Sequence, residues 1–403
     1  MLNIDAIRKQ FPSLSLKDKN GNQIIYLDGP GGTQVPNMVI EGISNYYKKC
    51  NANTHGEFNT SKETDILMDS LREKASIFLG AENKKCISLG HNMTTLNFSL
   101  ARGLSKLFRK GDEVIITDLD HEANRGPWRV LKETGVKLIE VRLLQDGGLD
   151  YEDFRNKIND KTVMVCMGMS SNALGTLNDF ISVKSFLPQN CLFLLDAVHY
   201  APHFSINVKE LGCDFLLCSA YKFYGPHVGF LYSKPGLLEQ LETDRLVVQD
   251  QKAPYIIETG TLNHAACAGV SSAIDFIANI GDGNSSRDKL INAFSKISSH
   301  EFALAKQLYE SINNLDKVNV IGKDFSDTKR TPTVSFVHSD HTPQEICKAL
   351  ASENICAWDG HFYALKAIQQ LGLEERGGVT RLGISIYNTK EEVERVVSVI
   401  SKL

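Results

Sequence analysis

The chain has 403 residues and a net charge of -4, with 42% hydrophobic and 23% charged residues, which is the composition of an ordinary folded protein. The sequence has no basic block and no apolar run of about 20 residues, which argues against a nucleic-acid partner and against a membrane-spanning segment. Its nine cysteines are scattered without a CxxC pair and no secretory signal is readable at the start, so we expect a cytoplasmic protein without a zinc site.

Short β-rich runs alternate with amphipathic stretches between residues 85 and 235. This alternation predicts an α/β domain with a mostly parallel seven-stranded sheet. Several runs are apolar throughout, as expected for strands that are covered on both faces. The predicted strands are KCISL (85–89), DEVIITD (112–118), KLIEVRLL (137–144), TVMVCMGM (162–169), CLFLLDAV (191–198), DFLLCSA (214–220) and VGFLYS (228–233).

A long helical region follows at 265–313, where IGDGNSSRD is the only cluster of helix-breaking residues. The rest of the chain mixes strands and helices, which predicts a smaller C-terminal α+β domain. We therefore expect an N-terminal segment 1–20 that packs with the small domain, a large domain 21–265 and a small domain 266–403. The small-domain elements are strand 318–322, strand 331–338, helix 342–353, strand 354–358, an irregular loop, strand 379–386 and helix 389–402.

An aspartate and a lysine follow two consecutive predicted strands. Asp196 ends the buried run CLFLLDAV, and Lys222 follows DFLLCSA. In open α/β sheets ligands bind at the carboxyl ends of the strands. A carboxylate there can keep a ring nitrogen protonated, and a partly desolvated lysine can form an imine with an aldehyde. Singly, these residues also suit a helix cap and a solvated lysine, but together they favour a pyridine aldehyde cofactor.

A second element suits a phosphate group. The run SLGHNMTTLN passes from a strand into a helix whose first turn contains Met93 and Thr94, and the free N–H groups and dipole of a helix start favour an anion. The alternative is that Asn92 or Thr94 only caps the helix. Ser219 and Tyr221, beside the lysine, offer hydroxyl groups. The glycine-rich run DGPGGTQVP matches neither GxGxxG nor the Walker pattern, so it indicates a nucleotide loop only weakly.

Histidine and asparagine side chains follow the neighbouring strands. His121 could stack on a pyridine ring and move protons, although it could also be a surface histidine, and Asn172 could hydrogen-bond a phenolic oxygen or the substrate. His199 and His203, at i and i+4, support a rival reading as a zinc enzyme. Against it, HYAPH lacks the glutamate of the zincin pattern, and Pro202 disturbs a helix at this place.

With these residues in order, the chain resembles the class V aminotransferase family, and within it the cysteine desulfurase and selenocysteine lyase branch. The resemblance runs nearly end to end. It implies a fold-type I enzyme that uses pyridoxal 5'-phosphate, binds an amino-acid substrate and forms a homodimer with the active site at the interface. The segments that match are YLDGPGGTQVP, NANTHG, HNMTTLN, DLDHEANRGPW, SSNALGT, LLDAVHYAPH, SAYKFYGPHVG, ETGTLNH and TRLGISIYNT.

The resemblance also implies roles around the cofactor ring. Lys222 would be the Schiff-base lysine, and His121, the second catalytic residue, would stack on the ring. Asp196 would pair with the pyridine nitrogen. Asn172 and His199 would lie beside the phenolic oxygen, although a glutamine is common at the position of His199 in this family.

Further roles concern the phosphate and the substrate. The residues implied to hold the phosphate are Met93, Thr94, Ser219 and Tyr221. Tyr221 stands where the family usually has a histidine, and Thr261 would reach the phosphate of the partner subunit. Arg381 would bind the substrate carboxylate as a bidentate pair, with Asn172 and His361 also at the substrate.

One departure from the family bears on the reaction. Desulfurases of this type have a persulfide-forming cysteine in a loop after a GH dipeptide, whereas this chain has Tyr363 there, in CAWDGHFYALK. Cys356, in the preceding strand, is expected to be a buried structural cysteine. We therefore expect a C–S lyase that acts on cysteine or a cysteine conjugate by β-elimination. An aminotransferase, an epimerase or racemase, and a non-catalytic binding protein that retains the fold are the alternatives.

Overall fold

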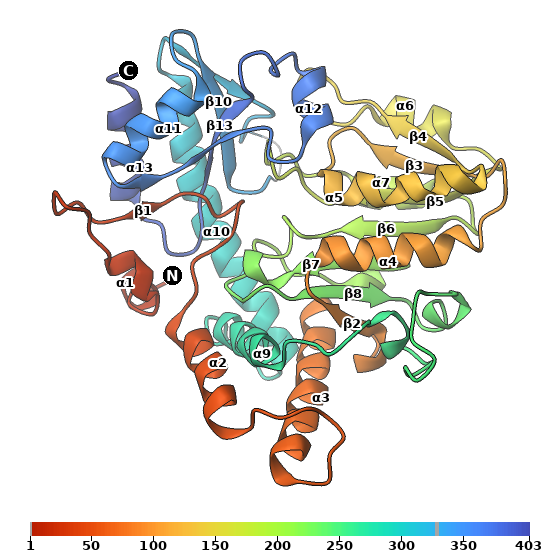
Figure 1. The fold of residues 1–403 in the computed structure, drawn as a ribbon. Coiled ribbons are helices and arrows are strands. Elements are labelled where there is room, and N and C mark those ends of the chain that lie inside the picture. Colours follow the sequence, from red (N-terminus) through yellow and green to blue (C-terminus); the bar gives the residue numbers. More distant parts are fainter. Residues whose placement is uncertain (1, 327–329) are drawn as a thin grey trace.

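A seven-stranded sheet forms the centre of the computed structural model, which describes residues 2–326 and 330–403 (Figure 1). Its strand order is β2-β8-β7-β6-β5-β3-β4, and only β8 runs antiparallel to its neighbours. The predicted α/β class and all seven predicted strands are confirmed. The strands are β2 (Ile87–Gly90), β3 (Glu113–Thr117), β4 (Lys137–Val141), β5 (Thr162–Gly168), β6 (Leu192–Asp196), β7 (Phe215–Ser219) and β8 (Gly229–Ser233).

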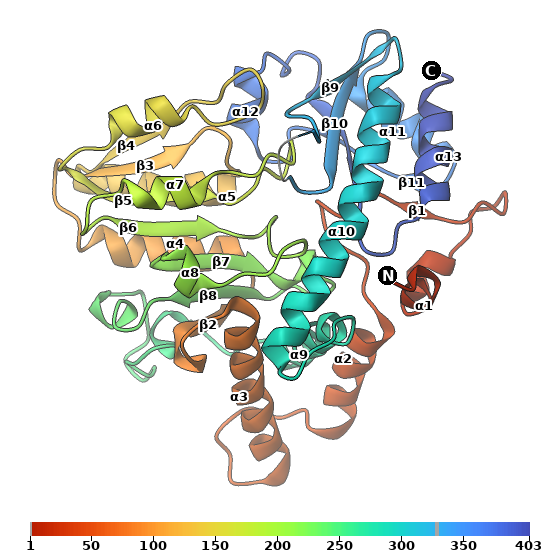
Figure 2. The same cartoon turned by 180° about the vertical axis from the view of Figure 1, so that it is seen from behind.

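Helices cover both faces of this sheet. Because side chains alternate along a strand, β6 directs Phe193 and Leu195 into one apolar cluster and Leu194 into another. Figure 1 shows α4 and α5 on one face, and Figure 2 shows α7 and α8 on the other. The helices around the sheet are α4 (Met93–Ser105), α5 (Glu122–Arg125), α6 (Tyr151–Lys157), α7 (Phe180–Ser185) and α8 (Val208–Leu211).

A four-stranded antiparallel sheet lies in the C-terminal part, in the order β12-β13-β10-β9. Its strands are β9 (Val318–Ile321), β10 (Thr333–His338), β12 (Trp358–Gly360) and β13 (Val379–Gly383), and the helices are α11 (Pro343–Ser352), α12 (Leu365–Gln370) and α13 (Lys390–Ile400). Two expectations were wrong. The single strand predicted at 354–358 is split, and the loop predicted after it contains α12, which buries Ala367 and Ile368.

The predicted strand 354–358 is split because its first half pairs with a strand from the N-terminal part of the chain. β11 (Ile355–Cys356) pairs in parallel with β1 (Ile25–Tyr26), whereas β12 pairs with β13. The two halves of the predicted strand therefore belong to different sheets. A pairing between residues so far apart in the sequence leaves no local signal.

Helices α9 (His264–Ala278) and α10 (Ser286–Asn313) confirm the predicted helical region and its break. A capping box between Ser285 and Asp288 begins α10. This helix contributes Leu290 to the apolar cluster of the large sheet and Leu304 to that of the small sheet. The N-terminal helices are α1 (Ile4–Arg8), α2 (Asn37–Lys49) and α3 (Asn59–Leu79).

The N-terminal segment contacts both parts of the molecule. Phe11 belongs to the cluster of the large sheet, and Arg8 forms an ion pair of 2.8 Å with Glu392 of α13. The domain boundaries at residues 20 and 265 remain predictions. Across residues 2–326 and 330–403, we find no helix whose length and apolar character would let it cross a bilayer.

Candidate active site

A cavity of about 660 Å³ lies at the carboxyl ends of β5, β6 and β7, a size suited to a small ligand. Gly168, Asp196 and Ser219, the last residues of these strands, all line it. Most of the predicted site residues come together here. Those that line the cavity are Met93, Thr94, His121, Asn172, Asp196, His199, Ser219, Tyr221 and Lys222.

Lys222 lies at the end of the short helical turn η4 (Ala220–Lys222) and is only 8% exposed. Its Nζ donates to the carbonyl oxygens of Pro30 and, at 3.1 Å, Gly31. Burial lowers the pKa of Lys222 to about 7, and the charge of Arg381 acts in the same direction. More of this amine is therefore neutral at pH 7 than of an ordinary lysine, and the neutral amine is the form that attacks an aldehyde.

Asp196 faces the same cavity from the end of β6. Its Oδ1 accepts a hydrogen bond from the amide of Val198 at 2.9 Å. Burial raises the pKa of Asp196 to about 7, and the neighbouring carboxylate of Asp120 raises it further. A cationic partner would favour the ionised form of this carboxylate.

Asn92 is the N-cap of α4, because its Oδ1 accepts from the amide of Thr95 at 2.9 Å. Asn92 thus caps the helix, and this cap is compatible with an anion at the same helix start. The amide of Met93 donates to Ser219 Oγ at 2.9 Å, which joins the helix start to the end of β7. Thr94 lines the cavity beside them, and the phosphate role of this group stays a prediction.

His121 caps α5, and its Nδ1 accepts from the amide of Ala123 at 3.0 Å. Burial lowers the pKa of His121 to about 4, and the charges of Lys222 and Arg381 lower it further. The ring is therefore neutral at pH 7, with its proton on Nε2. Its centroid lies 5.3 Å from that of Tyr363, with the ring planes at 35°.

Asn172 and His199 each have one buried polar atom without a hydrogen-bond partner in the described structure, Oδ1 and Nδ1 respectively. The other polar atom of each is held: Asn172 Nδ2 donates to the carbonyl of Phe362 at 2.8 Å, and His199 Nε2 lies 3.0 Å from Thr333 Oγ1. Unpartnered buried polar atoms beside a cavity suit a ligand with polar substituents. Together with the amine and the carboxylate, they fit pyridoxal 5'-phosphate.

The three remaining predicted residues do not line this cavity. Arg381, in β13, donates to the carbonyl of Asn172 at 3.0 Å and to Asp28 Oδ1 at 2.8 Å. His361 lies in the loop before α12, where its Nδ1 accepts from the amide of Tyr363 at 3.1 Å. Thr261 lines a separate cavity of about 910 Å³.

The loop that follows β12 contacts residues of the site. Phe362 and Tyr363 have φ of +51° and +59°, which is unusual for residues with side chains. The ring of Phe362 lies 3.9 Å from Arg381 Cζ, and Tyr363 is 67% exposed. Cys356 is only partly buried, contrary to the expectation of a buried cysteine, because β11 lies at the edge of a two-stranded sheet.

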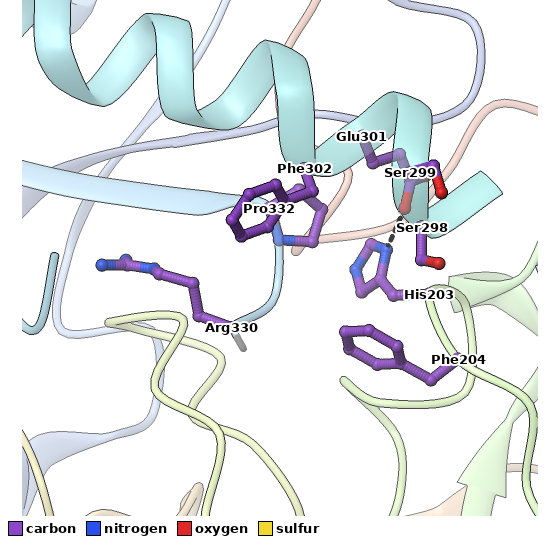
Figure 3. Close-up of a pocket in the computed structure, with 8 residues that line it drawn as sticks. All are labelled: His203, Phe204, Ser298, Ser299, Glu301, Phe302, Arg330 and Pro332. Atoms are coloured by element: carbon purple, nitrogen blue, oxygen red, sulfur yellow. Dashed lines mark hydrogen bonds and ion pairs between the residues drawn. The ribbon is translucent and has the colours of Figure 1, made fainter. Parts of the chain in front are cut away.

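His199 and His203, the basis of the zinc alternative, lie in a turn and not on one helix, and their rings are 5.6 Å apart. His203 Nδ1 pairs with Glu301 Oε2 at 2.7 Å beside a second cavity, of about 330 Å³ (Figure 3). Figure 3 also shows the guanidinium of Arg330 pointing away from His203. Within the residues that the structure describes, no three His, Cys, Asp or Glu side chains are placed to hold a metal ion.

Sequence reasoning missed three residues near the cavity. Asp120 accepts from the amide of Gly168 at 2.9 Å, and burial raises its pKa to about 6. The ring of His227 stacks on that of Tyr221 at 4.6 Å. Asp28, the first residue of DGPGG, holds Arg381. Asp120 and His227 could have been found from the sequence, since both lie within a few residues of predicted site residues.

Comparison with known proteins gives consistent results. The aminotransferase class-V family model matches residues 25–396. A probable cysteine desulfurase of Halalkalibacterium halodurans is 31% identical over 418 residues, covering 100% of this chain and 98% of that protein. A probable cysteine desulfurase of Vibrio cholerae is 28% identical with the same coverage. An apo structure of a cysteine desulfurase from Thermococcus onnurineus NA1 superposes with a TM-score of 0.87 at 26% identity, covering 100% of this chain and 98% of that one.

Proposed function

The chain belongs to the class V aminotransferase family, and from this membership we propose that it cleaves the C–S bond of cysteine or a cysteine conjugate by β-elimination. It is a fold-type I enzyme that depends on pyridoxal 5'-phosphate, so the predicted fold class and cofactor are confirmed. The specific reaction is our proposal. Its support is that most of the residues expected to bind the cofactor line one cavity, while a tyrosine stands where a sulfur-carrying cysteine would align.

Bound pyridoxal 5'-phosphate supplies an aldehyde that attaches amines and a ring that withdraws electrons from the α-carbon. Lys222 would hold the cofactor, and Asp196 would keep its ring nitrogen protonated. The phosphate would be held by Met93, Thr94, Ser219 and Tyr221. Asn172 and His199, whose unpartnered atoms are buried beside the cavity, would lie at the phenolic oxygen.

Lys222 is the residue best suited to move the substrate proton. With a pKa of about 7 its amine is partly neutral, so it can accept the α-proton. The Cβ–S bond then breaks, and its electron pair leaves with the sulfur. Arg381 would bind the substrate carboxylate, and the neutral His121 would face the cofactor ring.

The observation that favours direct release of the sulfur concerns Tyr363. By the resemblance of the segment CAWDGHFYALK, it stands where the desulfurase cysteine would align, and no cysteine is found among the described residues that line the cavity. A phenol cannot accept sulfur to form a persulfide. The sulfur would therefore leave as part of the product and not on the protein.

We also propose a homodimer, in which Thr261 would reach the phosphate of the partner subunit. Leu246, Val247 and Val248 near Thr261 are 64%, 98% and 91% exposed, which is unusual for a monomer surface. Light scattering should give twice the mass of the chain. Val247→Glu should shift the mass toward that of a monomer and weaken cofactor retention, whereas a monomeric wild type would contradict this proposal.

The central experiment is the visible spectrum of the protein after reconstitution with pyridoxal 5'-phosphate and desalting. We expect an absorption band in the wild type and in the control Lys234→Ala, which changes an exposed lysine that pairs with Asp214 at 3.6 Å, away from the cavity. Lys222→Ala should lose the covalently bound cofactor. A colourless wild type would overturn the proposal.

The reaction is then identified by a screen of cysteine, cysteine conjugates and their sulfoxides for release of pyruvate and ammonia. Product formation without an added amine acceptor supports β-elimination. Turnover that requires such an acceptor would indicate an aminotransferase, and loss of optical activity an epimerase or racemase. Persulfide trapped on Cys356 during turnover would indicate a desulfurase mechanism instead.

A further inference from the structure

The glycine-rich run DGPGG, which matched no nucleotide motif, contacts two basic residues that are expected in the site, Lys222 and Arg381. The turn Asp28–Gly32 lies between Arg381 and Lys222. Asp28 Oδ1 accepts from Arg381 Nη2 at 2.8 Å, and both side chains are buried, with exposures of 8% and 3%. The carbonyls of Pro30 and Gly31 accept from Lys222 Nζ.

The turn is internally fixed. The amides of Gly31 and Gly32 both donate to the carbonyl of Asp28, at 3.0 and 3.1 Å. A Cβ on Gly31 would lie 2.2 Å from Asp28 Oδ2, so only glycine leaves room for the carboxylate above the turn. The hydroxyl of Tyr26 donates to the carbonyl of Gly32 at 3.0 Å.

The chain on either side of the turn is attached to the elements that bear the two cations. The amide of Gly383, at the end of β13, donates to the carbonyl of Leu27 at 2.7 Å. On the other side, the amide of Thr33 donates to the carbonyl of Tyr221 at 3.1 Å, directly before Lys222. A shift of the turn would therefore move both Arg381 and Lys222.

Arg381 itself is held on three sides. Its Nη1 binds the carbonyl of Asn172, its Nη2 binds Asp28, and the ring of Phe362 covers its face. Its Nε is buried and has no hydrogen-bond partner among the described residues. The guanidinium thus keeps one N–H without a partner, in an orientation that Asn172, Asp28 and Phe362 fix.

We propose that Asp28 is a positioning residue for the active site: it orients Arg381 toward the substrate carboxylate and, through its turn, fixes the amine of Lys222. The substrate part of this inference rests on the proposed function. The simpler alternative is that Asp28 only neutralises a buried arginine and stabilises the fold. The two readings differ in what they predict for ligand binding by folded variants.

The first test uses a ligand that cannot react. Propionate has a carboxylate and no amine, and its binding to the cofactor-loaded protein can be followed through the visible band. We expect binding by the wild type, loss in Arg381→Ala, and a dissociation constant about 10-fold or more higher in Asp28→Ala. Asp28→Asn should show a smaller rise, because its amide oxygen can still accept from Nη2. Unchanged or tighter binding in Asp28→Ala would overturn the inference.

The second test is a double-mutant cycle on steady-state kinetics. If Asp28 acts through Arg381, Asp28→Ala should raise KM in the wild type much more than in Arg381→Ala. Equal effects in both backgrounds would show that Asp28 acts independently and would contradict the inference. Thermal unfolding identifies variants that fold, and Glu392→Gln, which weakens the partly buried pair with Arg8, is the matched control for loss of an ion pair.

The third test concerns Lys222 and needs no substrate. The negative charge of Asp28 raises the pKa of Lys222, so Asp28→Asn should move the pH midpoint of cofactor capture by the cofactor-free protein to a lower value. An unchanged midpoint would remove the lysine part of the inference. If Asp28→Ala weakens propionate binding while the wild type turns over no amino acid, the inference holds and only the proposed reaction fails. The failure of one can therefore be distinguished from the failure of the other.

Discussion

His203 Nδ1 and Glu301 Oε2 lie 2.7 Å apart, and the pair is buried beside the second cavity. The ring of His203 meets that of His199 edge to face at 5.6 Å. Glu301 comes from α10 and His203 from the turn after β6, so this pair also joins two distant segments. Breaking the pair between His203 and Glu301 should lower the stability of the protein more than it lowers the rate of the reaction.

Glu301→Ala should destabilise the protein by about 3 kcal/mol, because it removes one member of a buried pair. Glu301→Gln can keep a hydrogen bond to His203 and should cost less. The midpoint of urea unfolding, measured on the cofactor-free protein, checks this order. Equal losses in the two variants would show that the hydrogen bond contributes little.

Cofactor capture should depend on pH through Lys222. Because its pKa is lowered to about 7, the rate of capture should rise with pH and level off above about pH 7, and not near 10.5 as for an ordinary lysine.

The lowered pKa of Lys222 also affects the stability of the cofactor-free protein. The contribution of a base with a lowered pKa is fully present above pH 10.5 and is lost as the pH falls to about 7.

Stopped-flow absorbance with the cofactor-free protein measures the capture rate, and Lys222→Ala is the control for non-covalent binding. A midpoint close to 10 would mean that the amine is solvated in solution, against the burial seen here.

Asp196→Asn should raise the stability of the cofactor-free protein at pH 8 and lower its activity with bound cofactor. Asp196 has a raised pKa, so its contribution to stability is present below pH 3.8 and is lost as the pH rises through about 7. Removing this buried charge should stabilise the cofactor-free protein at pH 8, by on the order of 2 kcal/mol. Activity should fall about 100-fold or more, since the carboxylate no longer keeps the ring nitrogen protonated.

Denaturant unfolding at pH 5 and pH 8 and assays at saturating cofactor test both parts. Asp214→Asn, which alters a buried aspartate that binds the amide of Phe193, is the matched control and should lose stability with little change in kcat. A gain of stability in that control as well would mean that the effect is not specific to the cavity.

His121 should take part in catalysis with its ring in the neutral form. Since its pKa is about 4, the activity profile between pH 5 and pH 8 should contain no limb caused by this histidine. His121→Phe keeps an aromatic face and loses the Nε2 donor, so we expect the cofactor to be retained and kcat to fall about 100-fold. Full activity in His121→Phe would show that stacking alone suffices.

The sequence predicted the large sheet well because its signals are local. Runs such as TVMVCMGM and CLFLLDAV are apolar and bounded by turn residues, and both became strands with the predicted residues at their carboxyl ends. Parallel strands place those ends at one edge, so Asn172, Asp196 and Lys222 had to come together. The prediction of the cavity follows from that geometry.

The errors arose where the structure depends on distant partners. Nothing within NICAW indicates that Ile355 pairs with Ile25 while Trp358 pairs with Arg381. The ion pair between Asp28 and Arg381 also joins residues far apart in the chain. Such contacts have no periodicity, so local patterns could not reveal them.

Helix α10 has a consequence for how the molecule unfolds. Its 28 residues run from the apolar cluster under the large sheet, at Leu290, to the cluster of the small sheet, at Leu304. An unbroken helix that is part of two cores cannot lose one of them without exposing part of its own apolar face. The two halves of this protein should therefore denature together, in a single cooperative transition, even though each has a sheet of its own.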